Sequence, residues 1–421
     1  MPTAVVSLGR LPKALDICRA LDGAGWRVVV AEPSRRHLAG TSRAVARSVQ
    51  VPAPNEDADA YLDAMMGVLR EEDASLLVPV SEEVVHLSRI ADRLPPRVRW
   101  FGVGHDATLR MHDKAAFVAD AAKLGLAVPQ THGLGSREAQ LMADSGAVVV
   151  KPAFTCSGQG LVRVPAGGRL PDPGAAPRLV QRALPGRHTS SFSIVHEGRV
   201  IGTVVYTPVV TSGTVAAAFE RIEGAAEAGF AQRHVEAHGL SGFVSFDFIA
   251  DEAGVPRAIE CNPRATSGIH FVEPASLARA ILEPEACRRL TLRRARRMHQ
   301  FWPVLTEVQH AMFRPGRGYF AKMGTLLRST EVNWSWRDPL PVLAQPWAAW
   351  GILGVAAREG ISFGEAATRD IAWFGEPSGV GAQEVGAAFA DHDGGRIGVP
   401  ADDARHDRGV GDAQPVHPAH P

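Results

Sequence analysis

The residues best suited to chemistry are two acids and one amide on a predicted pair of strands. Asp247 lies in the first apolar run of this pair, and Glu260 and Asn262 lie in the second, with the turn residues 251–254 between them. Because side chains alternate along a strand, Glu260 and Asn262 point to the same face of the sheet. Three oxygen ligands there suit Mg²⁺, which completes its coordination shell with waters and phosphates. An exposed hairpin with scattered acids is the alternative, but an acid in the apolar surroundings of Glu260 is costly to bury without partners.

Three basic residues could neutralise phosphate charge near such a site. Arg264 follows the strand pair after one proline and could present its guanidinium to a phosphoryl group during transfer. Lys114 opens a predicted helix and Lys151 follows a predicted strand, in a chain with only five lysines among its 45 Lys and Arg residues. An ammonium group on a flexible stem suits a phosphate oxygen. Taken singly, each lysine could equally be an ordinary surface residue.

Two further segments have the composition of nucleotide-binding elements. Ser157, Gly158 and Gly160 lie in a glycine-rich loop between predicted strands, where small residues let backbone N–H groups approach phosphates. A simple hairpin turn is the alternative for this loop. The second segment is extended and flanked by apolar residues, so its backbone could read the edge of an adenine ring; its members are Gln181, Arg182, Ala183 and Leu184.

The pattern of the first hundred residues predicts a sheet, which precedes these motifs in the sequence. Apolar runs at residues 4–8, 26–31 and 76–80 alternate with helical periodicity, as at residues 14–21. This alternation predicts a parallel sheet covered by helices on both faces. The lone Gly9 after the first run does not complete the G-x-G-x-x-G pattern, which argues against a nicotinamide-binding domain.

The last third of the chain carries a basic run and most of the tryptophans. Six arginines between residues 288 and 297 could attract nucleic acid, but a solvated helix face is the favoured interpretation because no aromatic residues are interleaved. Six of the eight tryptophans lie between residues 302 and 373. They could cap the core or line an acceptor site, although plain packing is the simpler expectation. From about residue 376 onward the sequence lacks hydrophobic periodicity, which predicts disorder.

Composition limits the class of protein. The chain has 421 residues, 45% hydrophobic and 21% charged, with a net charge of zero. It can therefore bury a large core, and it offers no overall field to attract nucleic acid or a membrane. The four cysteines form no C-x-x-C pair, no secretory signal is evident, and the longest apolar stretch, near 347–357, is too short to span a bilayer. We expect a soluble, multidomain, cytoplasmic protein.

Taken in order, these motifs resemble those of the ATP-grasp superfamily, and more narrowly the branch related to the large subunit of carbamoyl phosphate synthetase. The resemblance covers roughly residues 1–285. It rests on Asp113-Lys114, Val150-Lys151-Pro152, Ser157-Gly158-Gln159-Gly160, Gln181-Arg182-Ala183-Leu184, Phe246-Asp247-Phe248 and Glu260-Cys261-Asn262-Pro263-Arg264.

The resemblance implies a combined α/β and α+β architecture in which two subdomains clamp ATP. The expected parts are a Rossmann-like pre-ATP-grasp domain at 1–104, subdomain A with a glycine-rich lid at 105–180, subdomain B with the metal site at 181–288, a Trp-rich C-terminal extension at 289–375 and a disordered tail at 376–421.

The resemblance also implies a role for each motif. Lys114 and Lys151 would bind phosphates, the loop around Gly158 would close over them, and residues 181–184 would read adenine. Two Mg²⁺ ions, or Mn²⁺, would be held by Asp247, Glu260 and Asn262, while Arg264 and Lys151 would act on the phosphoryl group. Gln181 stands where an acid is common, and His188 lies where the family usually offers a glutamate to the ribose.

The implied reaction is activation of a carboxylate as an acyl phosphate, with release of ADP, followed by attack of an amine. A thiol, hydroxyl or bicarbonate acceptor is an alternative, as is a non-catalytic ATP-binding regulatory protein. The expected partners are small-molecule substrates, with no nucleic acid or membrane, and a homodimer is compatible with the resemblance. Candidate substrate residues are Glu82, Glu83, Ser267 and His270, with Glu82 or Glu83 orienting an amine and Arg264 a carboxylate.

Overall fold

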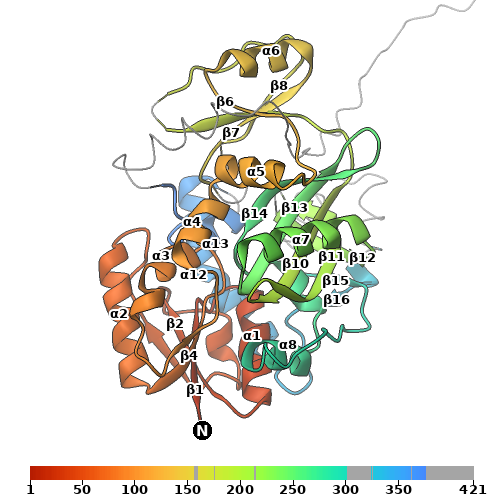
Figure 1. Cartoon of the computed structure of the whole chain (residues 1–421). Coiled ribbons are helices and arrows are strands. Elements are labelled where there is room, and N and C mark those ends of the chain that lie inside the picture. The colour runs from red at the N-terminus through yellow and green to blue at the C-terminus, as the bar shows by residue number, and fades with distance from the viewer. Residues whose placement is uncertain are drawn as a thin grey trace, which may run out of the picture.

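The computed structural model describes residues 1–155, 160–174, 176–212, 215–300, 324, 326–361 and 363–375, and the strands of this part form three sheets (Figure 1). The first sheet has the strand order β3-β2-β1-β4-β5, and all its neighbouring strands are parallel. Its three central strands, β2, β1 and β4, are short runs of mostly buried apolar residues, as expected for a sheet covered on both faces, whereas the edge strands β3 and β5 are polar or half-buried. They are β1 (Thr3–Ser7), β2 (Arg27–Glu32), β3 (Arg47–Gln50), β4 (Ala74–Val78) and β5 (Arg99–Trp100).

Helices cover the two faces of this first sheet. Helix α1 (Pro12–Gly23) packs its apolar stripe into the main core, and α2 (Ala58–Glu71) covers the opposite face with residues such as Met65 and Leu69. The predicted parallel α/β unit is confirmed, since the strands and helices alternate along the chain. Two short helical segments, α3 (Val84–Leu87) and η2 (Ser88–Arg93), lie between β4 and β5.

The second sheet has four strands and stands at one end of the molecule (Figure 1). Its order is β6-β9-β7-β8, and its neighbouring strands are antiparallel. Helix α6 (Arg137–Ser145) packs on one face through small apolar residues. The strands are β6 (Thr131–Gly133), β7 (Val148–Pro152), β8 (Val162–Val164) and β9 (Arg178–Arg182), and α4 (His105–His112) and α5 (Lys114–Lys123) lead into them.

The third sheet is the largest and carries the predicted acid-bearing hairpin at its edge. Its order is β14-β13-β10-β11-β12-β15-β16. The strands are β10 (His188–His196), β11 (Arg199–Ser212), β12 (Val215–Ile222), β13 (Gly242–Ala250), β14 (Pro256–Asn262), β15 (Arg297–His299) and β16 (Thr330–Glu331). Helix α7 (Ala225–His238) packs against β10 and β11. The predicted antiparallel pairing of the two apolar runs is confirmed, with Asp247 opposite Glu260 and Ser245 opposite Asn262.

The first and third sheets share one hydrophobic core. Val6 and Val78 of the first sheet belong to the same buried cluster as Phe192 and Phe243 of the third, and α1 packs directly on α8 (Pro274–Leu282). The backbone approaches closely at Gly242, where a Cβ atom would lie 2.6 Å from the Cα of Gly102. The backbone of Gly242 also has a φ of +102°, so this position requires glycine on both counts.

The basic run does not form the helix that we expected. Residues 288–296 contain no helix; Leu292 forms an isolated antiparallel bridge with Val272, and the N–H of Arg293 donates to the carbonyl of Phe271. Leu290, Leu292 and Ala295 are partly buried against the main core, and the two leucines are two residues apart, as on one side of an extended chain. The run is therefore an extended connection that lies along the 3-10 turn η3 (Ser267–Phe271).

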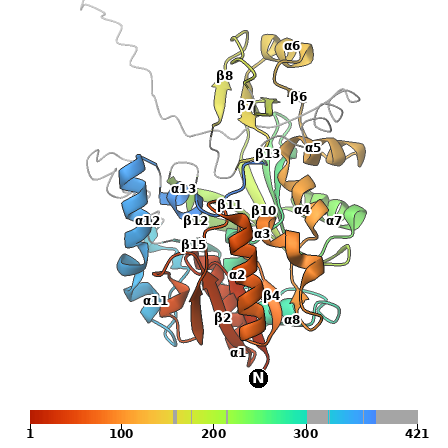
Figure 2. The same cartoon turned by 90° about the vertical axis from the view of Figure 1, so that its left-hand side faces the viewer.

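The described C-terminal residues form a small helical layer. Helices α11 (Leu340–Leu343), α12 (Gln345–Glu359) and α13 (Phe363–Thr368) lie beside the first sheet, as the turned view shows (Figure 2). Trp336 and Trp350 are largely exposed, so simple burial does not account for every tryptophan here. No helix in the described ranges is long and apolar enough to cross a membrane. The tail that we expected to be disordered, 376–421, lies outside the described residues.

Candidate active site

Three polar side chains converge on the edge hairpin of the third sheet. The register of β13 and β14 places Asp247 opposite Glu260, with Asn262 two residues further along the same face. The Nδ2 atom of Asn262 lies 3.0 Å from Oδ2 of Asp247 and 3.5 Å from Oε1 of Glu260. One hydrogen-bond donor thus sits between two carboxylates. The described residues contain no group of three or more His, Cys, Asp and Glu side chains arranged for a metal, so the candidate set is two acids and an amide.

The environment of Asp247 keeps its carboxylate ionised. Burial alone would raise the pKa of Asp247, but interactions with His188 and Ser190 outweigh burial and hold the pKa below its usual range. The Ser190 hydroxyl donates to Oδ1 of Asp247, and Nε2 of His188 lies 3.7 Å from the same atom. Both partners come from β10, the neighbouring strand of the sheet. Asp247 is therefore available as an anionic ligand at neutral pH.

Two buried lysines reach this hairpin from the other side. Lys114 is the first residue of α5, directly after Asp113, whose carboxylate caps the helix. Its Nζ atom lies 3.5 Å from Oε2 of Glu260 and donates to the carbonyl of Thr155 at 2.6 Å. Lys151 extends from β7, and its Nζ donates to the carbonyl of Ile259 on β14 at 3.2 Å. Both side chains are buried, and buried ammonium groups beside a carboxylate form a natural anion-binding arrangement.

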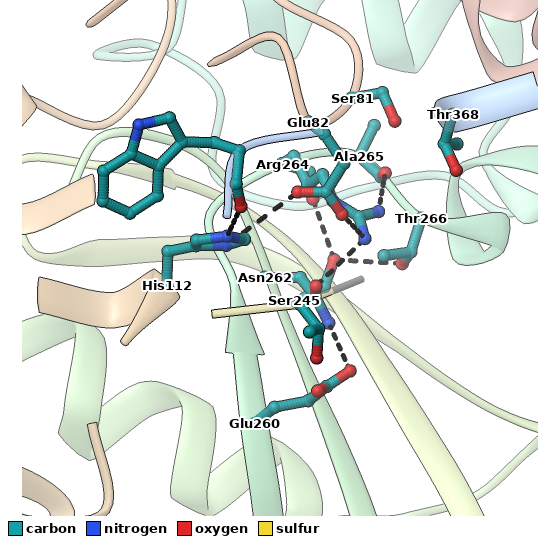
Figure 3. Close-up of polar contacts among 12 residues, drawn as sticks. Ser81, Glu82, His112, Ser245, Glu260, Asn262, Arg264, Ala265, Thr266 and Thr368 are labelled. Carbon is teal, nitrogen blue, oxygen red and sulfur yellow. Dashed lines mark hydrogen bonds and ion pairs between the residues drawn. The ribbon is translucent and has the colours of Figure 1, made fainter. Parts of the chain in front are cut away.

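Arg264 joins the hairpin to the first sheet. Its Nη2 atom lies 3.0 Å from Oδ1 of Asn262 and 2.5 Å from Oε1 of Glu82, which follows β4. Figure 3 shows the guanidinium of Arg264 between these two side chains. The side chain of Glu82 is only 2% exposed. Residues that are distant in the sequence therefore hold the arginine from both sides.

The carboxylate of Glu82 is a permanent anion. Burial would raise its pKa, but the charges of Arg264, His112 and Lys13 together lower the pKa of Glu82 to about 2. Nδ1 of His112 lies 3.9 Å from Oε2 of Glu82 (Figure 3). Burial lowers the pKa of His112 itself. Glu82 thus suits electrostatic positioning rather than proton transfer.

The other candidate substrate residues have structural partners. Glu83 accepts hydrogen bonds from the Ser7 hydroxyl and from the backbone of Val80 and Ser81, which closes the turn after β4. Nδ1 of His270 lies 2.5 Å from Oδ2 of Asp16 on α1. The structure brings neither side chain into contact with Arg264 within the part it describes.

Ser267 occupies a different position, as the first residue of η3, three residues after Arg264. Its side chain is half-buried, so this position stays a candidate by proximity alone.

The predicted base-reading segment places a fully buried amide on the inner face of the second sheet. Val148, Val150 and Val180 pack on α6, so Gln181, which is opposite Val149, points to the other face, as Lys151 does. Among the described residues, neither Nε2 nor Oε1 of Gln181 has a hydrogen-bond partner, although Gln181 is completely buried. An orphaned amide of this kind indicates a position where a polar ligand would complete the hydrogen bonding.

The backbone of the same segment is partly engaged. The N–H of Arg182 donates to the carbonyl of Gln130 and that of Ala183 to the carbonyl of Ala147. These two amides therefore do not serve as donors to a base in this structure. Leu184 forms an apolar cluster with Ile249 and Ile259 of the hairpin, which is suited to cover the face of a planar ring.

Part of the predicted phosphate loop lies outside the described residues. This applies to Ser157 and Gly158, which belong to the range 156–159. Gly160, the next described residue, has a φ of +70°, and its carbonyl accepts a hydrogen bond from Arg178. Glycine adopts a positive φ readily and other residues rarely do, which accounts for a glycine at position 160.

At the edge of the first sheet where a ligand would bind, a side chain of the protein itself occupies the position. The N–H groups of Gly9 and Arg10 donate to Oε2 of Glu32 at 2.7 and 3.0 Å, and the guanidinium of Arg10 grips the same carboxylate. In a dinucleotide-binding domain a phosphate would face the loop after the first strand. An ionised side chain lies here instead, which agrees with the absence of the glycine fingerprint.

Sequence reasoning missed Lys13 and His112, the two groups that flank Glu82. Lys13 donates to the Ser81 hydroxyl at 3.0 Å and to the carbonyl of Ala265 at 2.8 Å, which ties α1 to the residue after Arg264. The rarity of lysine in the chain was a usable signal for Lys13. His112 immediately precedes the Asp113-Lys114 motif, but nothing local indicates that it faces a glutamate from another element.

Comparisons with known proteins agree with this geometry. Residues 111–268 match the family model described as the ATP-grasp domain. The sequence has no match among curated proteins.

Three solved structures share the fold. They are N5-carboxyaminoimidazole synthetase from Staphylococcus aureus (TM-score 0.55, 12% identity, 69% of this chain and 80% of that chain), the biotin carboxylase domain of 2-oxoglutarate carboxylase from Hydrogenobacter thermophilus with MgADP and bicarbonate (0.53, 16%, 66% and 69%), and L-amino acid ligase from Bacillus licheniformis (0.52, 17%, 67% and 74%). Identities this low establish a common fold and nothing finer.

Proposed function

We propose that this chain is an ATP-dependent ligase that joins a small-molecule carboxylate to an amine, because its residues 111–268 match the ATP-grasp domain model and proteins of similar fold include a synthetase and an L-amino acid ligase. The observation that carries this proposal is the convergence of two lysines, one from α5 and one from the second sheet, on strand β14 of the acid-bearing hairpin. Lys114 pairs with Glu260, and Lys151 donates to the carbonyl of Ile259. Asp247 lies opposite Glu260 on β13, and Arg264 follows the end of β14. Such an arrangement suits phosphoryl transfer, in which catalysis consists mainly of positioning and charge neutralisation.

The acids and the amide of the hairpin fit a divalent cation. The Asn262 amide nitrogen now lies between Asp247 and Glu260, in the place that a cation bound to both carboxylates would take. Turning the Asn262 amide over would point its oxygen toward that place, completing a set of oxygen donors that suits Mg²⁺. It would also break the hydrogen bond that Nη2 of Arg264 donates to this oxygen, which releases the guanidinium from the amide. Bound there, Mg²⁺ would neutralise charge on the phosphates of ATP. We propose that Asp247, Glu260 and Asn262 hold it.

The proposed reaction has two steps, which the chain's own residues orient. In the first, a carboxylate oxygen of the substrate attacks the γ-phosphorus; the bond from that phosphorus to the bridging oxygen breaks, and ADP leaves. Lys114 and Lys151 would bind the phosphates, and Arg264 would contact the group in transfer. In the second, the amine attacks the carbonyl carbon of the acyl phosphate, phosphate leaves, and the amine nitrogen loses its proton.

The nucleotide base would lie against the inner face of the second sheet. Gln181 offers an amide with one donor and one acceptor side, which matches the N6 and N7 edge of adenine. The apolar cluster of Leu184, Ile249 and Ile259 would cover the ring. His188, beside Asp247, is the candidate for contacts to the ribose or the phosphates.

Glu82 has a more specific role in this scheme than orienting an amine. Its carboxylate is buried against Arg264, and it would hold the guanidinium in the direction of the transferred group. The charge of Glu82 is already compensated by its neighbours, which leaves little attraction for a substrate ammonium group. We propose that Glu82 is a positioning residue.

Hydroxylamine trapping tests the proposed function without knowledge of the natural amine. The protein is incubated with ATP, Mg²⁺, hydroxylamine and a panel of carboxylic acids, and ADP and hydroxamate are measured. We expect at least one acid to give both products in equal amounts. ADP release that depends on bicarbonate, with no hydroxamate from any organic acid, would assign a different acceptor. Nucleotide binding with no turnover under any condition would support a regulatory protein and contradict the proposal.

A further inference from the structure

The described residues after α13, 369–375, form a strap that runs from the loops of the first sheet to the candidate active site. Asp370 pairs with Nη1 of Arg10 at 2.7 Å, and Asn55 donates its backbone N–H to the carbonyl of Asp370. The side chain of Ile371 is completely buried in the main core. The strap is thus fastened to the loops at the ligand edge of the first sheet before it reaches the site.

Beyond this anchor, Trp373 contacts two elements of the candidate site. Its carbonyl is 3.4 Å from Nε2 of His112, and its ring centroid is 5.9 Å from the imidazole. The indole also meets the ring of Phe154 edge to face at 5.1 Å, and the His112 and Phe154 rings stack at 6.4 Å, so the three rings form one cluster. The strap continues close to the same ring, since a Cβ atom on Gly375 would lie 3.2 Å from Phe154.

Both ring neighbours of Trp373 are linked, through one intervening residue, to a side chain that we assign to the reaction. His112 faces Glu82, which grips Arg264. Phe154 directly precedes Thr155, whose carbonyl accepts a hydrogen bond from Lys114. The indole therefore lies beside both the arginine side and the phosphate side of the site, and it is half-buried rather than enclosed in the core.

We propose that Trp373 is a specificity-determining residue that forms an apolar wall for the organic acid and limits the size of its side group. This inference rests on the proposed function, because it assumes that a carboxylate is oriented by Arg264. The indole and the Phe154 ring offer apolar surface, and the charge of Glu82, the acid that pairs with Arg264, is already compensated. The chemical class that fits is a carboxylic acid with a small aliphatic side group.

The test compares hydroxamate formation by the wild-type protein and Trp373→Ala over acids of increasing side-group size, such as acetate, isobutyrate and phenylacetate. Truncating a wall of an apolar site changes discrimination by roughly 10-fold or more. We expect Trp373→Ala to raise kcat/KM for the bulky acid relative to the small one by at least that factor, with the KM for ATP unchanged. Phe374→Ala is the matched control, because this neighbouring ring is 45% exposed and should leave the ratio unaltered.

Two outcomes overturn the inference. An unchanged ratio in Trp373→Ala, when the wild-type protein does form hydroxamate, would contradict the role of Trp373 alone. If the wild-type protein forms no hydroxamate from any acid, the proposed function fails and this inference falls with it. Should Trp373→Ala not fold, Trp373→Leu keeps apolar packing against Phe154 while removing most of the ring, and the same ratio decides.

Discussion

Replacing Glu82 with glutamine removes a negative charge from the interior and leaves the guanidinium of Arg264 without its ionic partner. The pKa of Glu82 falls from an ordinary 4.5 to about 2 in the folded protein. At about 1.4 kcal/mol for each tenfold change in an ionisation constant, this corresponds to roughly 3 kcal/mol of stability at neutral pH. Because the folded pKa is the lower one, the contribution is fully present above pH 4.5 and is lost as the pH falls toward 2.

The prediction for Glu82→Gln is therefore a loss of about 3 kcal/mol in the free energy of unfolding near pH 7, with a smaller difference from the wild-type protein near pH 3. Urea unfolding followed by circular dichroism measures both values. Asp59→Asn is the control, because Asp59 pairs with Arg89 at 3.1 Å on an exposed surface, where such a pair contributes under about 1 kcal/mol. If Glu82→Gln proved no more destabilising than Asp59→Asn, our account of Arg264 and its buried partner would be refuted.

Two further predictions concern the nucleotide. Gln181→Leu removes a buried amide that has no partner among the described residues, so it should stabilise the unliganded protein by about 1 kcal/mol while raising the KM for ATP. Thermal melts with and without ATP measure the stability, and steady-state kinetics measure the KM. An unchanged KM would contradict a role for Gln181 in binding the base. Lys114→Met should lower kcat/KM for ATP by roughly 30-fold or more, as expected for a lost charged hydrogen bond, with little change in the KM for the organic acid; equal effects on both substrates would contradict a phosphate-binding role.

Features that depend on neighbouring residues were predictable from the sequence. The pairing of β13 with β14 follows from two apolar runs joined by a short turn, and strand alternation then places Glu260 and Asn262 on one face. The start of α5 at Lys114 is equally local, because Asp113 caps the helix through the N–H groups of Ala115 and Ala116.

Features that depend on long-range packing were not predictable in the same way. The contact of Glu82 with Arg264 exists only because the first sheet and the third share one core, and no local signal specifies that docking. The adjacent Glu83 has the same chemistry and the same apparent position after β4, yet its carboxylate closes a turn through Ser7 and Val80. Two adjacent glutamates therefore have different roles, because Glu82 points toward Arg264 and Glu83 points into the turn.

The basic run shows where sequence periodicity was misjudged. A cluster of arginines suggested a solvated helix face, but three apolar residues between them, Leu290, Leu292 and Ala295, pack on the core, and the two leucines are two residues apart. Arg293 in this run is not part of a free basic surface, because it pairs with Asp16 of α1 at 2.7 Å. The period of the few apolar residues was therefore more informative than the density of charge.

The central claim is that the two acids of the edge hairpin hold a divalent cation that positions a triphosphate for transfer. The most direct measurement is the rate of Mg²⁺-dependent ADP release by Asp247→Asn combined with Glu260→Gln, at saturating ATP and acid. Both substitutions keep the size and shape of the side chains while removing their charges. We expect the double variant to lose nearly all turnover, and a rate equal to that of the wild-type protein would contradict the account.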